Sequence, residues 1–164
     1  MDVEKSALWV ARGIYKSFPG VQALDDVSLD IFPGEVHALV GENGSGKSTL
    51  VKCLAGANQL DQGELLYQGN PVVFHNPTEA RAHGVATIYQ EFSVVPSLSV
   101  AENIFLGNYK THGSTGMIDW PVMRENTRKV LEQLSLTLDP DAIVNTLSVA
   151  EQQLVEIAKA ISIN

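Results

Sequence analysis

Residues 41–49 read Gly41-Glu42-Asn43-Gly44-Ser45-Gly46-Lys47-Ser48-Thr49 and contain the pattern G-x-x-x-x-G-K-[ST], which is typical of phosphate-binding loops. The apolar run at residues 36–40 comes directly before the loop and predicts a buried strand. After the loop, apolar residues recur at helical spacing until Gly56, where we expect the helix to end. A glycine turn that carries a lysine by chance would not need these two flanking elements. The sequence therefore favours a site for a nucleotide polyphosphate.

The residue types in this loop suit such a ligand. Glycines at positions 41, 44 and 46 allow positive φ angles and a close approach of the backbone to phosphate oxygens. Backbone N–H groups can then converge on the phosphates, and the helix N-terminus adds its partial positive charge. We predict that Lys47 reaches the β- and γ-phosphates and that the Ser48 hydroxyl binds Mg²⁺. The loop therefore predicts a nucleotide with a β- and a γ-phosphate, bound together with Mg²⁺.

Composition narrows the class of protein. Eleven basic residues stand against 19 acidic ones in 164, a net charge of −8, which argues against a nucleic-acid partner. Cys53 is the single cysteine, so we expect no intrachain disulfide, and its place on the helix after the loop favours burial. No apolar run approaches the roughly 20 residues of a membrane span, and no signal core is present. We expect a cytoplasmic chain that can lie against a membrane protein.

The remaining pattern predicts an α/β fold. Alternating or apolar runs predict strands at residues 8–14, 27–32, 64–67, 72–74 and 85–89, the third and fourth pairing as a hairpin through Gly69-Asn70. Helices are expected from Asn76-Pro77 to about residue 82, within residues 96–107, from Asp119-Trp120-Pro121, and after Ser148. Two of them begin with capping boxes, at Ser99–Glu102 and at Ser148–Glu151. Tyr15 and Phe18 could each be a core residue or stack on a base.

Together these stretches resemble the ATP-binding subunits of ABC transporters over nearly the whole chain. The resemblance includes an A-loop at Lys16-Ser17-Phe18-Pro19-Gly20-Val21-Gln22-Ala23-Leu24, which implies that Phe18 stacks on adenine, with Tyr15 as the alternative. It includes a Q-loop at Ile88-Tyr89-Gln90-Glu91, which implies that Gln90 is a catalytic residue together with Lys47 and a metal ligand together with Ser48. Residues 96–107, from Pro96 to Gly107, resemble the segment that contacts the transmembrane permease subunits.

The sequences of several motifs are most similar to those of importers of monosaccharides and nucleosides. Examples are Met117-Ile118-Asp119-Trp120 and Val155-Glu156-Ile157-Ala158-Lys159-Ala160. The resemblance implies an ABC-type P-loop NTPase with an antiparallel β subdomain and the loop core at about residues 1–93, and a helical subdomain at about residues 94–164. It also implies that the full-length protein hydrolyses Mg·ATP to import a sugar-like solute. Such a protein works on the inner face of the cell membrane, with a second nucleotide-binding domain.

The sequence departs from the family pattern in two places. The first is Ser148-Val149-Ala150-Glu151, which occupies the place of the family's signature motif. In the family this motif contacts ATP bound to the opposite domain. The family usually has two glycines at the positions of Val149 and Ala150, and a glutamine at the position of Glu151. Side chains and a carboxylate here should weaken that contact. The chain also ends at Asn164, truncated before the Asp-Glu strand and the switch histidine of the family. We therefore expect a fragment that binds ATP and hydrolyses it negligibly alone. Either it self-associates through its open sheet edge, or residues 1–164 are only the ordered part of a longer chain.

Two other functions fit the loop less well. One is an ABC ATPase without a transporter, acting in translation or repair; residues 96–107 and the importer-like wording count against it. The other is a P-loop kinase or a GTPase. The chain contains no Asn-Lys-x-Asp motif for reading guanine, and a kinase has no use for a signature region.

Overall fold

The computed structural model describes residues 6–89, 93–113 and 116–162. The chain forms two compact units, Met1–Val85 and Ala86–Asn164, and each has its own hydrophobic core. We call them the first and the second unit and describe each by itself.

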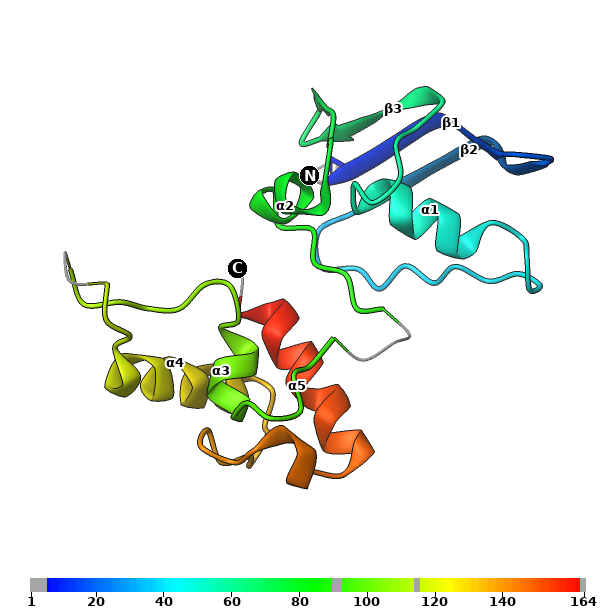
Figure 1. Ribbon diagram of the computed structural model, residues 1–164. Coiled ribbons are helices and arrows are strands. Elements are labelled where there is room, and N and C mark those ends of the chain that lie inside the picture. The colour runs from blue at the N-terminus through cyan, green and yellow to red at the C-terminus, as the bar shows by residue number, and fades with distance from the viewer. Residues whose placement is uncertain (1–5, 90–92, 114–115, 163–164) are drawn as a thin grey trace, which may run out of the picture. The chain divides into compact units, whose positions relative to one another are not determined.

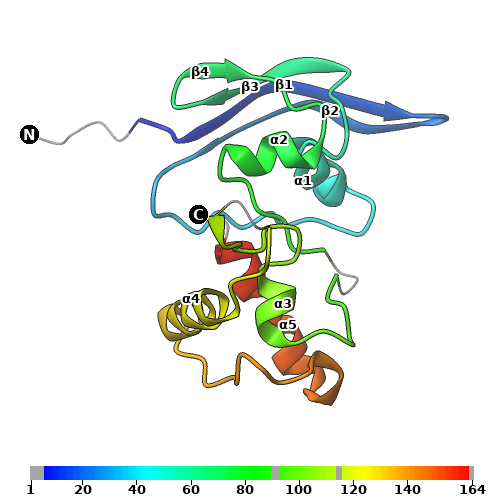
Figure 2. The ribbon, with the colours of Figure 1, turned by 60° about the vertical axis from the view of Figure 1, so that its left-hand side comes forward.

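The first unit is built on an antiparallel sheet with the strand order β2-β1-β3-β4 (Figures 1 and 2). Its strands are β1 (Trp9–Phe18), β2 (Val21–Ile31), β3 (Gln62–Tyr67) and β4 (Asn70–Val72). The β3–β4 hairpin confirms the expected pairing, and β1 and β2 form a second hairpin. Gly20 and Gly69 turn the chain in these two hairpins, with φ angles of 82° and 78°. Both strands extend further toward the turn than the predicted ranges 8–14 and 27–32, because Phe18 pairs directly with Val21 and only Pro19 and Gly20 form the loop.

Helices α1 (Lys47–Leu54) and α2 (Pro77–Ala82) cover one face of this sheet, as both views show (Figures 1 and 2). Asn76 caps α2 by accepting from the backbone N–H of Glu79, as the Asn-Pro pair predicts. Between the sheet and the helices lies the first core, which consists of Ala11, Ile14, Leu24, Leu50, Cys53, Leu65, Phe74 and Ala80. The expected burial of Cys53 is confirmed, with 2% of the residue exposed, and burial raises the pKa of its thiol.

Two strand predictions are wrong. Residues 36–40 and 85–89 form no strand, and Val36 and Val40 are 99% and 93% exposed. An apolar run becomes a buried strand only where neighbouring strands take up its backbone N–H and C=O groups. The sheet of the described residues is antiparallel and consists of four other segments, so it gives neither run a partner.

These exposed segments lead to a prediction about association. Because Val36 and Val40 sit in an extended apolar segment without ladder partners, the 164-residue chain should self-associate at micromolar concentration through strand pairing. Light scattering should give a mass above 17.7 kDa, and Val36→Lys with Val40→Lys should shift the chain toward the monomer. The control pair is Val122→Lys with Ile161→Lys, which changes exposed aliphatic residues of the second unit. A monomeric wild type, or equal effects of the two pairs, would contradict this prediction.

The second unit is helical, with α3 (Val100–Ile104), α4 (Trp120–Gln133), α5 (Val149–Ile161) and a short 3-10 helix, η2 (Val144–Thr146). Both predicted capping boxes are present, Ser99 with Glu102 on α3 and Ser148 with Glu151 on α5, and Asp119 caps α4. The helices pack around Val100, Ile104, Met123, Leu131, Val144 and Val155. Within the described residues of the whole chain, no helix has both the length and the apolar character that crossing a bilayer requires.

Candidate functional site

The glycine-rich loop leads directly into α1. Gly44 and Gly46 adopt φ angles of 85° and 89°, in the left-handed region that glycine tolerates, and the helix begins at Lys47. Gly46 is the N-cap residue and offers no side chain to the first turn. The first-turn N–H groups of a helix have no intrahelical acceptor, so here they remain available to an anionic ligand. This geometry fits a phosphate group.

Gly46 also packs the loop against strand β2. A Cβ atom at this position would lie 2.4 Å from the carbonyl oxygen of Ala23 and 3.0 Å from Cδ2 of Leu24. Leu24 in turn pairs with Lys16 on β1, near the end of the hairpin that carries Phe18. The contact therefore holds the start of α1 beside the hairpin from which we expect the base to be bound.

The side chain of Lys47 folds back over the loop. Its Nζ donates to the carbonyl oxygens of Gly41 and Glu42, both at 2.7 Å, and lies 3.3 Å from Oγ of Ser45. Neutral carbonyls are weaker partners for an ammonium group than charged phosphate oxygens are. A polyphosphate in the loop would thus offer Lys47 better acceptors than it has here.

The other loop residues are accessible to a ligand. Glu42 and Asn43 are exposed, Ser48 is exposed in the first turn of α1, and Thr49 is half-buried. A hydroxyl at the start of this helix is a suitable oxygen ligand for Mg²⁺ next to a bound phosphate. The second predicted metal ligand, Gln90, lies outside the described residues.

Of the two aromatic candidates for base stacking, Phe18 is the accessible one. Its ring is at the end of the β1–β2 hairpin and 42% of the residue is exposed, with Nζ of Lys16 over the ring, 5.6 Å from the centroid. Tyr15 is half-buried, and burial raises the pKa of its hydroxyl. We retain Phe18 as the candidate.

The predicted signature residues form the N-terminus of α5 in the second unit. The carboxylate of Glu151 accepts from the backbone N–H of Ser148 at 2.8 Å and from its hydroxyl at 2.7 Å, and Ser148 Oγ accepts from the N–H of Glu151 at 3.3 Å. These bonds hold the pKa of Glu151 below its usual range, so it is ionised at neutral pH. Val149 and Ala150 are exposed next to it. A carboxylate thus lies at the N-terminus of α5, bonded to the residue that caps the helix.

Sequence reasoning missed the role of Asp61. No sequence pattern singles out Asp61, yet it bonds to three consecutive residues of β1. It also missed a buried contact in the second unit, where the Glu156 carboxylate on α5 accepts from the backbone N–H of Ser93. Both contacts join residues far apart in the sequence, and no local pattern signals them.

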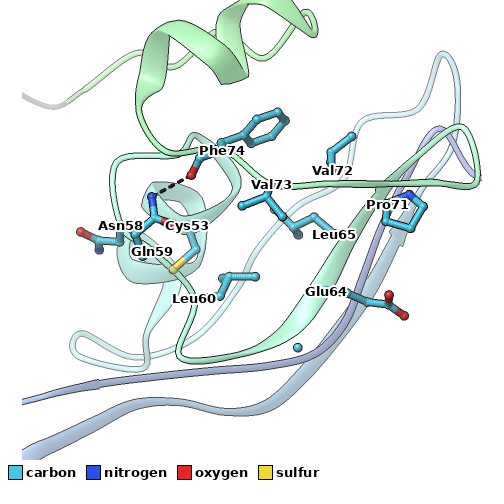
Figure 3. Close-up of a pocket in the computed structure, with 11 residues that line it drawn as sticks. Cys53, Asn58, Gln59, Leu60, Glu64, Leu65, Pro71, Val72, Val73 and Phe74 are labelled. Atoms are coloured by element: carbon cyan, nitrogen blue, oxygen red, sulfur yellow. Dashed lines mark hydrogen bonds between the residues drawn. The ribbon is translucent and has the colours of Figure 1, made fainter.

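A separate pocket of about 230 Å³ lies in the first unit between α1 and the β3–β4 hairpin (Figure 3). Figure 3 shows the aliphatic side chains of Leu60, Leu65 and Val73 around the thiol of Cys53. The Gln59 amide is already bonded to the carbonyl oxygen of Phe74, at 2.7 Å. No residue of the glycine-rich loop lines this pocket, so it is distinct from the phosphate site.

Comparison with known proteins gives consistent matches. The family model described as "ABC transporter" matches residues 24–164. The ribose import ATP-binding protein RbsA 1 of Streptomyces coelicolor is 50% identical over 161 residues, which are 98% of this chain and 32% of that protein. The galactose/methyl galactoside import ATP-binding protein MglA of Salmonella typhimurium is 48% identical over 153 residues, 93% of this chain and 30% of that protein.

Among solved structures, a nucleotide-free ATP-binding cassette from an ABC transporter superposes with a TM-score of 0.82 at 27% identity. The match covers 97% of this chain and 66% of that one. The chain spans about a third of the length of the curated relatives that it matches.

Proposed function

The chain belongs to the ABC transporter ATP-binding family, and on that premise we propose that residues 41–49 bind Mg·ATP to power the import of a sugar-like solute. The observation that carries the proposal is the loop itself. Gly46 caps α1 without a side chain, and Lys47 already faces the inside of the loop, bonded to Gly41 and Glu42. Helix N–H groups without an intrahelical acceptor and an ammonium group beside them are suited to binding a polyphosphate.

We propose a division of roles within the site. The backbone of residues 41–49 and the Lys47 ammonium hold the phosphates, the Ser48 hydroxyl binds Mg²⁺, and Phe18 stacks on the base. A Mg²⁺ ion held there would neutralise part of the phosphate charge. We propose Gln90 as the second metal ligand and as a catalytic residue, on the resemblance to the Q-loop alone.

The full-length protein, in this proposal, is an ATPase at the inner face of the cell membrane. Its partners are transmembrane permease subunits, contacted through the region from Pro96 to Gly107, and a second nucleotide-binding domain whose ATP meets Ser148 to Glu151. The names of the relatives support a sugar as the solute, because RbsA and MglA are import proteins for ribose and for galactose or methyl galactoside. The identities of about 50% and the importer-like wording favour this over a non-transport ATPase.

Uptake measurements test the transport part of the proposal. Cells in which the gene for the full-length protein is deleted should lose ATP-dependent uptake of at least one labelled pentose or hexose. The wild-type gene should restore it, and a Lys47→Ala gene should not. Unchanged uptake of a full panel of pentoses and hexoses would contradict a role in sugar import.

The base should contribute to affinity without strong selectivity. We expect ATP and GTP to bind within about tenfold of each other, roughly 1.4 kcal/mol, because stacking on Phe18 depends little on base identity. Phe18→Ala should weaken both nucleotides by a similar factor, about 1 kcal/mol or more. Calorimetric titration measures this, with Val21→Ala, the exposed cross-strand neighbour, as the control. A strong ATP preference that survives Phe18→Ala would show that another group reads the base.

A further inference from the structure

Asp61 fixes the part of β1 that comes just before Phe18. Its backbone N–H donates to the carbonyl oxygen of Tyr15 at 3.0 Å. Its carboxylate accepts from the backbone N–H of Ser17 at 2.6 Å and from Nζ of Lys16 at 2.7 Å. Three consecutive residues of the strand are thus bound to one residue outside it.

Lys16 connects Asp61 to the ring of Phe18. The Lys16 side chain is only 14% exposed, and its ammonium group contacts Asp61 while lying over the Phe18 ring, 5.6 Å from the centroid. A cation at this distance from an aromatic face is attracted by the ring. With the ammonium on one face of the ring, the other face is the one that a base can use.

Asp61 is also connected to the phosphate side of the site. It ends the segment that follows α1, and that segment is tied to the helix because the N–H groups of Ala57 and Asn58 both donate to the carbonyl oxygen of Lys52, at 2.8 and 3.1 Å. Helix α1 begins at the phosphate loop, so one short stretch of chain links the two halves of the nucleotide site.

We propose that Asp61, acting through Lys16 and Ser17, is a positioning residue that holds Phe18 where the nucleotide base stacks. This inference rests on the proposed function, because it requires that the base bind at Phe18. It goes beyond that function in assigning a role in base affinity to a residue that touches neither the base nor the phosphates in our proposal.

A purely structural role for Asp61 would predict something different. If the residue only stabilised the sheet, its loss would lower the affinity for every ligand of the site and would lower the melting temperature. If it positions Phe18, its loss should affect only ligands that carry a base. Inorganic tripolyphosphate separates the two cases, since it occupies the phosphate loop and has no base.

The test measures the affinities of the 164-residue chain for Mg·ATP and for tripolyphosphate with Mg²⁺, using Asp61→Asn. This variant keeps the shape and an oxygen acceptor for Ser17 but removes the charge that holds Lys16. The matched control is Asp30→Asn, which removes the same charge from the Arg12–Asp30 ion pair elsewhere in the same sheet. We expect Asp61→Asn to weaken ATP by about threefold to fivefold, with tripolyphosphate unchanged, and Asp30→Asn to change neither.

A double-mutant cycle completes the test. In a Phe18→Ala background, Asp61→Asn should no longer affect ATP affinity, because the two residues act as one unit. Equal losses for ATP and tripolyphosphate, or a loss of ATP affinity that persists without Phe18, would overturn the inference. An unchanged ATP affinity in Asp61→Asn would also overturn the inference. If Phe18→Ala still lowered the affinity for ATP in that case, the proposed function would stand. A wild type that binds neither ligand would overturn both.

Discussion

Replacing Lys47 with alanine should lower the affinity of the chain for Mg·ATP by about ten- to a hundredfold. The ammonium of Lys47 is within reach of the loop interior, where it bonds to the carbonyl oxygens of Gly41 and Glu42 at 2.7 Å. A charge-assisted hydrogen bond to a phosphate contributes about 1.5–3 kcal/mol, and each 1.4 kcal/mol is a factor of about ten in affinity. Calorimetric titration of wild type and variant with Mg·ATP gives the ratio directly.

Lys52→Ala is the matched control for this experiment. Lys52 is exposed and lies in the last turn of the same helix, outside the loop. Its replacement by alanine removes the same charge as Lys47→Ala. Its loss should change the affinity by less than about twofold, since exposed charges at this distance are largely screened by salt. Equal effects of Lys47→Ala and Lys52→Ala would mean that net charge attracts the nucleotide, and the assignment of the loop would fail.

Much of the fold could be predicted because its signals are local. The capping boxes at Ser99 and Ser148, the Asn76 cap and the turn at Gly69 each depend on a few neighbouring residues, and each is present in the structure. The loop and its helix followed from one motif for the same reason.

The two wrong strands show where local reasoning stops. The run at residues 36–40 is apolar except for His37, which is typical of a strand with both faces covered. Apolar side chains favour burial, but the run does not contain the neighbouring strands that would bury it. In this structure Val36 and Val40 are almost fully exposed. A strand is a property of at least two segments, so one segment cannot establish it.

The candidate site shows the same limit. Residues 41–49 were found from their spacing, and Phe18 from the resemblance, but the link between them could not be read from either stretch. No sequence motif around Asp61 marks it as part of a site, and its contacts with Tyr15, Lys16 and Ser17 span more than 40 positions. The packing of Gly46 against Ala23 is equally invisible, because a loop glycine has the same appearance whether it faces solvent or another backbone.

That last contact gives the prediction with the largest expected effect on stability. Gly46→Ala combines two penalties: a φ of 89°, which costs an alanine about 1–2 kcal/mol, and a new Cβ atom 2.4 Å from the carbonyl oxygen of Ala23. Because the obstacle is backbone of β2, either the loop or the strand must move. We expect a total loss of about 3 kcal/mol or more in the free energy of unfolding of the first unit, and Mg·ATP binding to fall with it.

Gly44→Ala separates the two penalties within the same loop. Gly44 has nearly the same φ, 85°, but a Cβ atom there would have no heavy atom within 4 Å. It should therefore lose only the conformational part, about 1–2 kcal/mol. For a unit of this size, each 1 kcal/mol corresponds to roughly 4–8 °C in melting temperature, so a thermal melt followed by circular dichroism resolves the two variants. If Gly46→Ala melted at the same temperature as Gly44→Ala, the loop would not pack against β2 as described, and the link between the phosphate loop and the Phe18 hairpin would lose its structural basis.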